Sequence, residues 1–248
     1  MSLPAPTTAT TTGSASSANA PGSAAPLVDR IRCWLFDLDN TLYPPATALF
    51  DQIDVKMGQF IMQLARCDAA EARAIQKRYF HDHGTTLAGL MMHHGVEAED
   101  FLRFVHDVDL SHVGPDHGLR AAISRLPGEC HIFTNADADY ARAVLRARGL
   151  DGLFSSIIDI RATGYIPKPQ AGAYSRMAAQ IGGFSPECAV FIDDMSRNLR
   201  PAHAMGITTV WLDNGSESGD RDHDADHVDH HIDDLALWLN GVTNGGAG

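Results

Sequence analysis

The stretch Phe36-Asp37-Leu38-Asp39-Asn40-Thr41 places two carboxylates, one residue apart, at the end of a mostly apolar run that begins near Val28. A run of this kind that stops sharply in turn-forming residues is typical of a buried parallel strand. Ligands of open α/β sheets bind beyond the carboxyl ends of the strands. We therefore expect Asp37 and Asp39 to face a functional site.

Strand and helix patterns alternate again in the second half of the chain. Further strands are expected at 131–133, 156–160, 188–192 and 207–212, with helical patterns between them. Five strands that alternate with helices predict a parallel sheet with right-handed crossovers, in an α/β fold with three α/β/α layers. Polar residues follow the strand ends and can share one edge of this sheet: Asp37, Asp39, Thr134, Lys168, Asp193 and Asp194.

A block of helical patterns separates the first strand from the second. Apolar residues recur at the spacing of one helix face from Leu49 to Leu64, and Asp68 with Glu71 resembles a capping box at the start of the next helix. The block is too long for a simple crossover, so it predicts an inserted helical subdomain, a cap, over the mouth of the site.

These patterns divide the chain into four parts. Residues 1–26 form an uncharged Ala, Ser, Thr, Pro and Gly tract that we expect to be a disordered tail, because it lacks the features of a signal or transit peptide. The α/β core is expected at 27–43 and 117–240, the helical cap at 44–116, and a flexible C-terminus at 241–248.

The charge balance limits the possible partners. The chain has 19 basic against 31 acidic residues, a net charge of −12, which disfavours a nucleic acid polymer or an anionic membrane as partner. Much of the acidity lies in the His- and Asp-rich segment 213–234, for which we expect a solvated acidic loop, with adventitious metal binding by its histidines as the alternative. The four dispersed cysteines and the lack of a membrane-spanning run predict a cytoplasmic protein with reduced thiols.

The residues at the strand ends suggest a chemistry. Of two carboxylates at i and i+2, one can attack an electrophile while the other gives a proton to the leaving group and later takes one from water. Several converging carboxylates repel one another, so a hard cation such as Mg²⁺ is expected. Lys168 can neutralise charge on the transferred group, and Thr134 with the backbone amide of Asn135 can bind its oxygens.

Four ordered motifs resemble those of the haloacid dehalogenase superfamily, in its phosphatase branch with a helical cap after the first motif. They are Asp37-Leu38-Asp39-Asn40-Thr41, then Thr134, Lys168 and Asp193-Asp194. The resemblance covers residues 31 to about 240 and implies a Rossmann-like core. True dehalogenases lack an acid at the position of Asp39, so the resemblance disfavours dehalogenation.

The resemblance also implies a role for each motif residue. Asp37 would be the nucleophile that forms an aspartyl-phosphate and a Mg²⁺ ligand, and Asp39 the general acid and base, with its backbone carbonyl on the metal. Thr134 would hold the phosphoryl oxygens, and Lys168 would stabilise the phosphoenzyme. Asp194 would bind Mg²⁺ directly, and Asp193 through water or as support. Asn198 stands where many relatives carry an acid, with a possible role in orienting Lys168.

A narrower likeness points to the pyrimidine 5'-nucleotidase group of that superfamily. It is carried by 36–45, by Gly84-Thr85-Thr86-Leu87-Ala88-Gly89-Leu90, by Val105-His106-Asp107 and by Thr134-Asn135-Ala136. One departure is Tyr140, which stands where many members have His. The likeness implies a small phosphorylated metabolite as partner, a nucleoside monophosphate.

Five residues are candidates for contact with this substrate: Asn135, His83, Thr85, Thr86 and His106. The cap histidines match no zinc-ligand spacing, so a metal site in the cap is disfavoured.

The sequence thus predicts a Mg²⁺-dependent phosphomonoesterase that prefers pyrimidine nucleoside 5'-monophosphates. Two alternatives stay open: a sugar-phosphate or vitamin-precursor phosphatase or phosphomutase on the same core, and a catalytically idle regulatory binding protein. The oligomeric state is not predicted.

Overall fold

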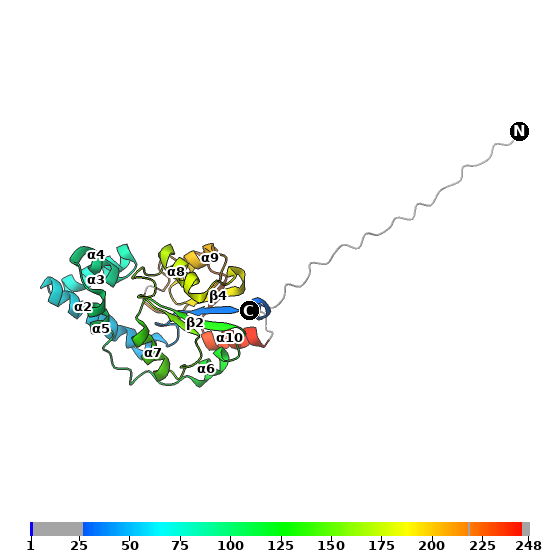
Figure 1. Cartoon of the computed structure of the whole chain (residues 1–248), viewed down its shortest axis with the longest axis horizontal. Helices are drawn as coiled ribbons and strands as arrows, with labels where there is room; N and C mark the ends of the chain where they lie inside the picture. Colours follow the sequence, from blue (N-terminus) through cyan, green and yellow to red (C-terminus); the bar gives the residue numbers. More distant parts are fainter. Residues whose placement is uncertain (2–26, 218, 245–248) are drawn as a thin grey trace.

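The computed structural model describes Met1 and residues 27–217 and 219–244 (Figure 1). The N-terminal tract 2–26, for which a disordered tail was expected, lies outside the described residues, as does the end of the chain from residue 245. Within the described residues, no helix is both long and apolar enough to cross a membrane.

Six parallel strands form one sheet in the order β3-β2-β1-β4-β5-β6. The strands are β1 (Cys33–Phe36), β2 (Glu129–Phe133), β3 (Ser156–Ile158), β4 (Ala189–Asp193), β5 (Thr208–Leu212) and β6 (His230–Ile232). The register pairs Phe36 of β1 with Ile132 of β2 and Ile192 of β4. Residues that follow Phe36 therefore lie level with the ends of both neighbouring strands, and the expectation of a shared polar edge is met.

Helices cover both faces of the sheet, so the predicted three-layer α/β/α fold is confirmed. On one face lie α6 (His117–Ile123), α7 (Ala138–Ala147) and α10 (Leu235–Thr243), and on the other α8 (Ala171–Ile181) and α9 (Ser196–Ala204) (Figure 1). Side chains of β1 point alternately to the two faces of the sheet and pack under both helix layers. Trp34 and Phe36 belong to one apolar cluster, and Cys33 and Leu35 belong to the other.

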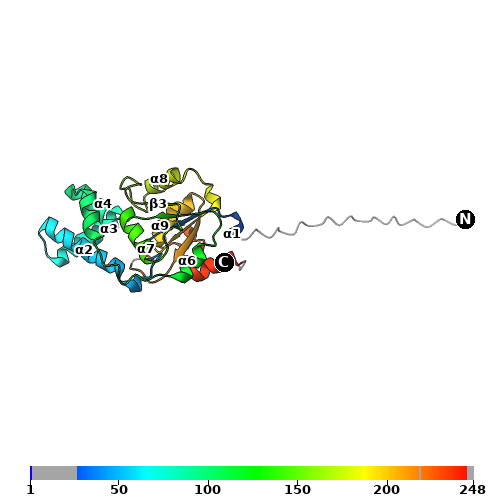
Figure 2. The same ribbon diagram turned by 60° about the horizontal axis from the view of Figure 1, so that its bottom comes forward.

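Four helices after β1 form the cap: α2 (Leu49–Ala65), α3 (Ala69–His83), α4 (Thr86–His94) and α5 (Ala98–Val105). The short helix α1 (Leu27–Arg30) precedes β1, and a 3₁₀ turn, η1 (Pro45–Thr47), leads into α2. Asp68 caps α3 by accepting a hydrogen bond from the amide of Glu71 at 2.9 Å, as the capping-box pattern predicts. Both views show the cap at one end of the core, away from α6 and α10 (Figures 1 and 2).

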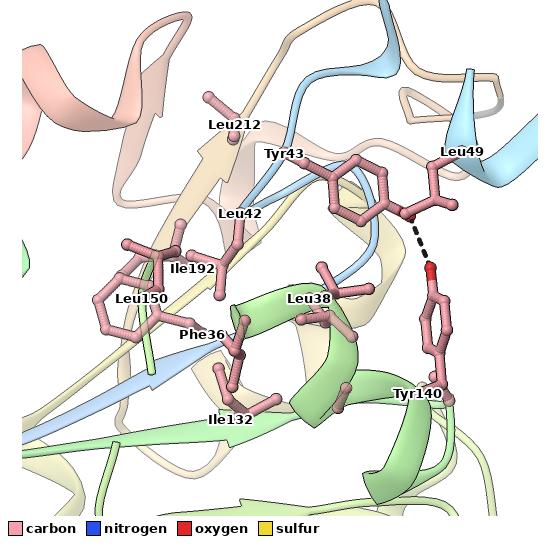
Figure 3. Packing of buried hydrophobic residues seen from close by; sticks show 14 of the residues in the cluster. Phe36, Leu38, Leu42, Tyr43, Leu49, Ile132, Tyr140, Leu150, Ile192 and Leu212 are labelled. Atoms are coloured by element: carbon pink, nitrogen blue, oxygen red, sulfur yellow. Dashed lines mark hydrogen bonds between the residues drawn. The ribbon is translucent and has the colours of Figure 1, made fainter. Parts of the chain in front are cut away.

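The loop that carries the first motif is anchored by its apolar residues. Leu38 and Leu42 are fully buried, and Figure 3 shows them packed with Phe36, Ile132 and Ile192 near the strand ends. Each buried leucine of this kind stabilises its position by about 1.5–3 kcal/mol. The two carboxylates between these anchors are therefore held at the sheet edge, not on a freely moving loop.

The elements differ from the sequence prediction at the C-terminal end of the chain and at the third strand. β6 and α10 were not predicted, and α10 extends to Thr243, into the segment 241–248 for which a flexible end was expected. The predicted third strand, 156–160, is also shorter, since β3 ends at Ile158. The 3₁₀ turns η2 (Pro186–Cys188) and η3 (Ala225–His227) complete the core.

The expectation of a solvated loop in the acidic segment is wrong at His227, whose ring is buried in the core. His227 is buried and hydrogen-bonded to Ser196 at the start of α9, and His231 stacks on Trp211 with ring centroids 4.5 Å apart. Burial of the His227 ring and the stacking of His231, whose side chain is 57% exposed, supply packing that the aspartates around them cannot. The four cysteines are free thiols, as expected.

Candidate active site

The site is centred on a buried lysine between two carboxylates. The Nζ atom of Lys168 lies 2.7 Å from Oδ1 of Asp37 and 2.7 Å from Oδ2 of Asp193. Lys168 is 1% exposed, and its ammonium also lies 5.2 and 5.1 Å from the ring centroids of Phe133 and Phe191. Burial alone would lower the pKa of Lys168, but Asp193 and Asp37 outweigh it and raise that pKa. The lysine therefore stays charged in this position.

Asn135 holds the Lys168 loop against the end of β2. Its side-chain oxygen accepts from the backbone N–H of Lys168 at 2.8 Å, and its amide donates to the carbonyl of Lys168 at 3.2 Å. This reciprocal pair fixes where the lysine stem leaves the chain. Asn135 was expected to contact substrate through its backbone amide, and the structure shows that its side chain is used to position Lys168.

Asn198 acts on Asp193 and not directly on Lys168. Its Nδ2 donates to both carboxylate oxygens of Asp193, at 2.9 and 3.0 Å, and the backbone N–H of Met195 donates to Oδ1 at 2.8 Å. Asp193 is completely buried, so these donors offset much of the cost of burying its charge. A role of Asn198 in orienting Lys168 would therefore act through Asp193.

Three buried carboxylates are close enough to share a cation. Oxygens of Asp37, Asp193 and Asp194 lie within 4.8 Å of one another, and they form the one such cluster found among the described residues. Burial raises the pKa of Asp194 well above its ordinary value, with Asp193 and Asp37 adding to the effect. Burial likewise raises the pKa of Asp37, although Lys168 opposes it.

The cluster fits a magnesium ion by charge and by donor type. One ammonium faces three carboxylates, and a divalent cation would balance the remaining charge in a site where only hard oxygen ligands converge. Thr41 links two of these acids, because its hydroxyl donates to Asp37 at 3.3 Å and accepts from the backbone N–H of Asp194 at 3.1 Å.

Asp39, the second acid of the first motif, is held by two tyrosines. Oδ1 of Asp39 accepts from the hydroxyl of Tyr43 at 2.6 Å and from that of Tyr140 at 2.8 Å. Sequence reasoning missed Tyr43, and it noted Tyr140 as a departure from related sequences without assigning it a role. Asp39 is absent from the side-chain cluster above, so any metal contact it makes would use its backbone carbonyl.

A cavity of about 200 Å³ opens between this sheet edge and the cap. The core contributes the acids and Lys168 with Thr134, and the cap contributes mostly apolar side chains from all four of its helices. Thr134 is buried, and its hydroxyl accepts from the amide of Ala136 at 3.0 Å. The cap residues in the wall include Phe50, Ile53, Met57, Phe80, Leu87, Phe101, Leu102 and Val105.

The predicted cap contacts divide into two groups. Thr85, Thr86 and His106 line the cavity together with Asn135, whereas His83 is not among the lining residues. The Nε2 atom of His83 instead lies 3.0 Å from Nε2 of His93. The geometry therefore does not support a substrate contact by His83, because its ring is engaged with another helix of the cap.

Each lining residue of the predicted set also has a structural partner. Thr85 caps α4 by accepting from Ala88 at 3.2 Å, and the hydroxyl of Thr86 donates to the carbonyl of Gln76. His106 pairs with Asp137, the residue that caps α7. Burial raises the pKa of Asp137, but the hydrogen bond from His106 and further donors outweigh it and hold that pKa at about 2.

Sequence reasoning missed the polar floor of the cavity. Gln76 and Asp54, both lining residues, are joined by a 2.7 Å hydrogen bond from Nε2 to Oδ1, and Asp54 also pairs with Arg73. Gln76 is 3% exposed. In the sequence these three residues look like ordinary surface positions of amphipathic helices, so nothing there marks them as a site.

The fold and the strand-end cluster define a hydrolase of the haloacid dehalogenase type. A family model described as haloacid dehalogenase-like hydrolase matches residues 31–206, which is most of the chain, and the protein belongs to this family. The match contains all four motifs at the sheet edge.

Among curated proteins, the chain resembles phosphate metabolism protein 8 of Saccharomyces cerevisiae, with 26% identity over 196 residues. The match covers 72% of this chain and spans 60% of the yeast protein. At this level of similarity, the yeast protein's own activity does not by itself establish the activity of this chain.

Solved structures share the fold at lower identity. The HAD-hydrolase YfnB from Bacillus subtilis, bound to magnesium, has a TM-score of 0.57 at 19% identity and covers 86% of this chain and 99% of its own. A HAD phosphatase from Thermococcus onnurineus gives 0.58 at 17% identity, covering 87% and 99%. The L-2-haloacid dehalogenase from Xanthobacter autotrophicus gives 0.56 at 15% identity, covering 88% and 100%. These likenesses establish the fold and do not choose between its reactions.

Proposed function

We propose that this hydrolase is a Mg²⁺-dependent phosphomonoesterase that acts through an aspartyl-phosphate and prefers pyrimidine nucleoside 5'-monophosphates. The observation that carries the proposal is the triad of Asp37, Lys168 and Asp193, with Asp39 beside it at the mouth of the cavity. A charged lysine next to a carboxylate nucleophile suits the transfer of an anionic phosphoryl group.

The first step uses Asp37 and Asp39. A carboxylate oxygen of Asp37 attacks phosphorus in line, and the bond from phosphorus to the ester oxygen breaks. Asp39 gives its proton to the departing oxygen, so the alcohol leaves neutral. Lys168 stays hydrogen-bonded to Asp37 and neutralises charge on the transferred phosphoryl group, whose oxygens Thr134 and the backbone amide of Asn135 bind.

The second step reverses the role of Asp39. Its carboxylate takes a proton from water as that water attacks phosphorus, which releases inorganic phosphate and regenerates Asp37. Asp37, Asp194 and the backbone carbonyl of Asp39 would hold Mg²⁺, with Asp193 in support. When bound, the ion would neutralise charge on the phosphoryl oxygens.

The side chains of the cap wall suit the binding of a leaving group that carries a flat, weakly polar ring. Apolar side chains dominate the wall, including Phe50, Phe80 and Phe101, and such surfaces favour a nucleobase over the many hydroxyls of a sugar. Paired polar groups such as Gln76 and Asp54 offer places for hydrogen bonds to the edge of a base. The pyrimidine preference is based on the likeness of the first motif and of the segment from Gly84 to Leu90 to the pyrimidine 5'-nucleotidase group.

Asp39 also bears on dehalogenation, because fold neighbours include haloacid dehalogenases. An acid at this position suits protonation of an ester oxygen, which a halide leaving group does not need.

The proposal is tested by hydrolysis of UMP, CMP, AMP, glucose 6-phosphate and p-nitrophenyl phosphate with the pure protein. We expect Mg²⁺-dependent release of phosphate, abolished by chelator, and a higher kcat/KM for UMP and CMP than for the others. A flat or sugar-biased profile would remove the nucleotide assignment and keep the phosphatase one. Turnover of every ester at chelator-independent rates, or of none with Mg²⁺ present, would overturn the phosphatase mechanism.

A further inference from the structure

We propose that Tyr43 and Tyr140 are positioning residues that fix the carboxyl group of Asp39 so that its proton is carried by Oδ2 and directed at the leaving oxygen. The inference rests on the proposed function, in which Asp39 is the general acid. It assigns a role to two residues that belong to none of the four motifs.

The geometry that carries the inference is the convergence of two donors on one oxygen. The hydroxyls of Tyr43 and Tyr140 lie 2.6 and 2.8 Å from Oδ1 of Asp39. A carboxylate oxygen offers two lone pairs, so two phenol donors leave Oδ1 no place for a proton of its own. The acid form of Asp39 must then carry its proton on Oδ2. No described residue is found donating a hydrogen bond to that second oxygen, which is therefore free for substrate.

The two tyrosines are placed by different parts of the fold. Tyr43 follows the first motif at the entrance to the cap, and Tyr140 lies in the first turn of α7, whose start is capped by Asp137. The two hydroxyls are 3.2 Å apart, the contact that the dashed line in Figure 3 marks. Each phenol has one proton, and the shorter contacts of 2.6 and 2.8 Å assign both protons to Oδ1 of Asp39. Both rings are almost fully buried, at 1% and 4% exposure. Neither donor can turn away without disrupting the core around it.

Burial also keeps both phenols protonated. It raises the pKa of each tyrosine well above its ordinary value, and the neighbouring Asp39 adds to the shift. Both hydroxyls are therefore protonated at neutral pH and can donate to Asp39, as their positions require.

His106 fixes the ring of Tyr140 from the cap side. The two rings stack with centroids 4.3 Å apart and an interplanar angle of 12°, and His106 is itself paired with Asp137. This residue was expected to contact substrate. His106 lines the cavity, and its contacts also hold Tyr140, and through it Asp39, in place.

The test compares two esters that differ in leaving group and hardly in size. Phenyl phosphate needs a proton on its departing oxygen, whereas p-nitrophenyl phosphate releases a stabilised anion. For Tyr140→Phe and Tyr43→Phe we expect kcat/KM to fall about tenfold or more on phenyl phosphate and less than about threefold on p-nitrophenyl phosphate. The ratio kcat/KM reports the steps up to cleavage of the ester, so the later attack of water does not enter it.

Tyr79→Phe is the matched control. Tyr79 is a buried cap tyrosine whose hydroxyl lies 2.9 Å from Nε2 of His94, away from the cavity wall. We expect it to change both esters by the same factor. Thermal unfolding of all three variants checks that the fold is kept, and either site variant alone suffices if the other fails to fold.

The outcomes separate the inference from the proposed function. If the wild type hydrolyses both esters with Mg²⁺ and both site variants lose equal factors on the two, the positioning role is overturned while the phosphatase mechanism stands. If the wild type hydrolyses neither these esters nor UMP with Mg²⁺, the proposed function is rejected, and the inference with it. A selective loss on phenyl phosphate in the site variants alone supports the inference.

Discussion

The sheet edge and the cap wall form opposite sides of one cavity, and they are built in different ways. At the edge, polar side chains follow β1, β2 and β4 and bind one another, as the chain of contacts from Asp37 through Lys168 to Asp193 shows. The cap wall consists mainly of apolar helix faces. Strand register places the first set, whereas the packing of α2–α5 places the second.

This difference separates the reaction from the choice of substrate. A hydrogen-bonded, buried cluster is sensitive to every member, because removing one partner leaves a charge uncompensated. An apolar wall tolerates change of shape at a modest cost in binding. We therefore expect substitutions at the edge to affect turnover strongly, and substitutions in the wall to alter which esters are bound.

The largest expected effect is at the nucleophile. Asp37→Asn should reduce kcat by at least about 10⁴-fold, because an amide cannot form the acyl-phosphate. The variant should still fold, because Lys168 keeps its second partner, Asp193. Initial-rate assays with UMP measure the loss of turnover, and circular dichroism with thermal unfolding checks that the variant is folded. Near-normal turnover by a folded variant would contradict the assignment of Asp37 as nucleophile.

Lys168→Met tests whether the edge acts as one unit. It leaves Asp37 and Asp193 buried without their shared cation, so we expect a loss of about 3–5 kcal/mol in unfolding free energy without Mg²⁺. Turnover should fall about 10²–10³-fold. The control Lys56→Met removes a pair with Asp107, whose side chain is 86% exposed, so it should lower the unfolding free energy far less than Lys168→Met. Equal destabilisation by both variants would contradict the special status of the edge.

The sheet edge could be predicted from sequence because each of its acids and Lys168 follows an apolar run or a turn that can be recognised locally. Parallel strands then bring those ends together, whatever the details of packing. The pair Tyr43 and Tyr140 could not be found in this way. Their hydroxyls meet across 97 residues of chain, and a tyrosine near an apolar pattern looks like an ordinary core residue.

The C-terminal elements escaped prediction for a related reason. β6 is an edge strand of three residues, His230–Ile232, and it lies in a segment whose composition indicates a solvated loop. Its order depends on the stacking of His231 on Trp211 and on the burial of His227, which are tertiary contacts with β5 and α9. Local composition carries no signal for such contacts.

Phe80→Ala tests the cap wall. Phe80 lines the cavity, and the guanidinium of Arg197 lies 4.2 Å from its ring centroid. Loss of this aromatic surface should raise KM for UMP about five- to tenfold and leave kcat/KM for a small aryl phosphate within about twofold. Phe104→Ala is the control, because Phe104 packs on Phe60 in the cap and is not a lining residue. If Phe80→Ala lowers kcat/KM for UMP and for the aryl phosphate by the same factor, a role of Phe80 in substrate choice is contradicted.

The smallest expected effect concerns the contact that joins the wall to the edge. Glu99 of α5 accepts two hydrogen bonds from Arg161, each at 2.7 Å, and one from Tyr165 at 2.8 Å, and both partners lie in the core. The hydrogen bonds from Arg161 and Tyr165 lower the pKa of Glu99 to about 2. Its side chain is 53% exposed, so solvent screening limits the stabilisation to about 0.5 kcal/mol or less.

The lowered pKa of Glu99 determines how this contact changes the stability of the fold with pH. A lowered pKa means that the contact stabilises the folded state above the ordinary value of 4.5 and loses this effect as the pH falls from there toward about 2. Thermal unfolding of the wild type and Glu99→Gln should therefore differ by about 1–2 °C near neutral pH, and the difference should shrink as the solution is acidified. Glu97→Gln, beside it at the start of α5 with no ion pair found among the described residues, should show no such trend. A difference that persists unchanged to about pH 2 would mean that the Glu99 contact does not stabilise the folded state through its charge.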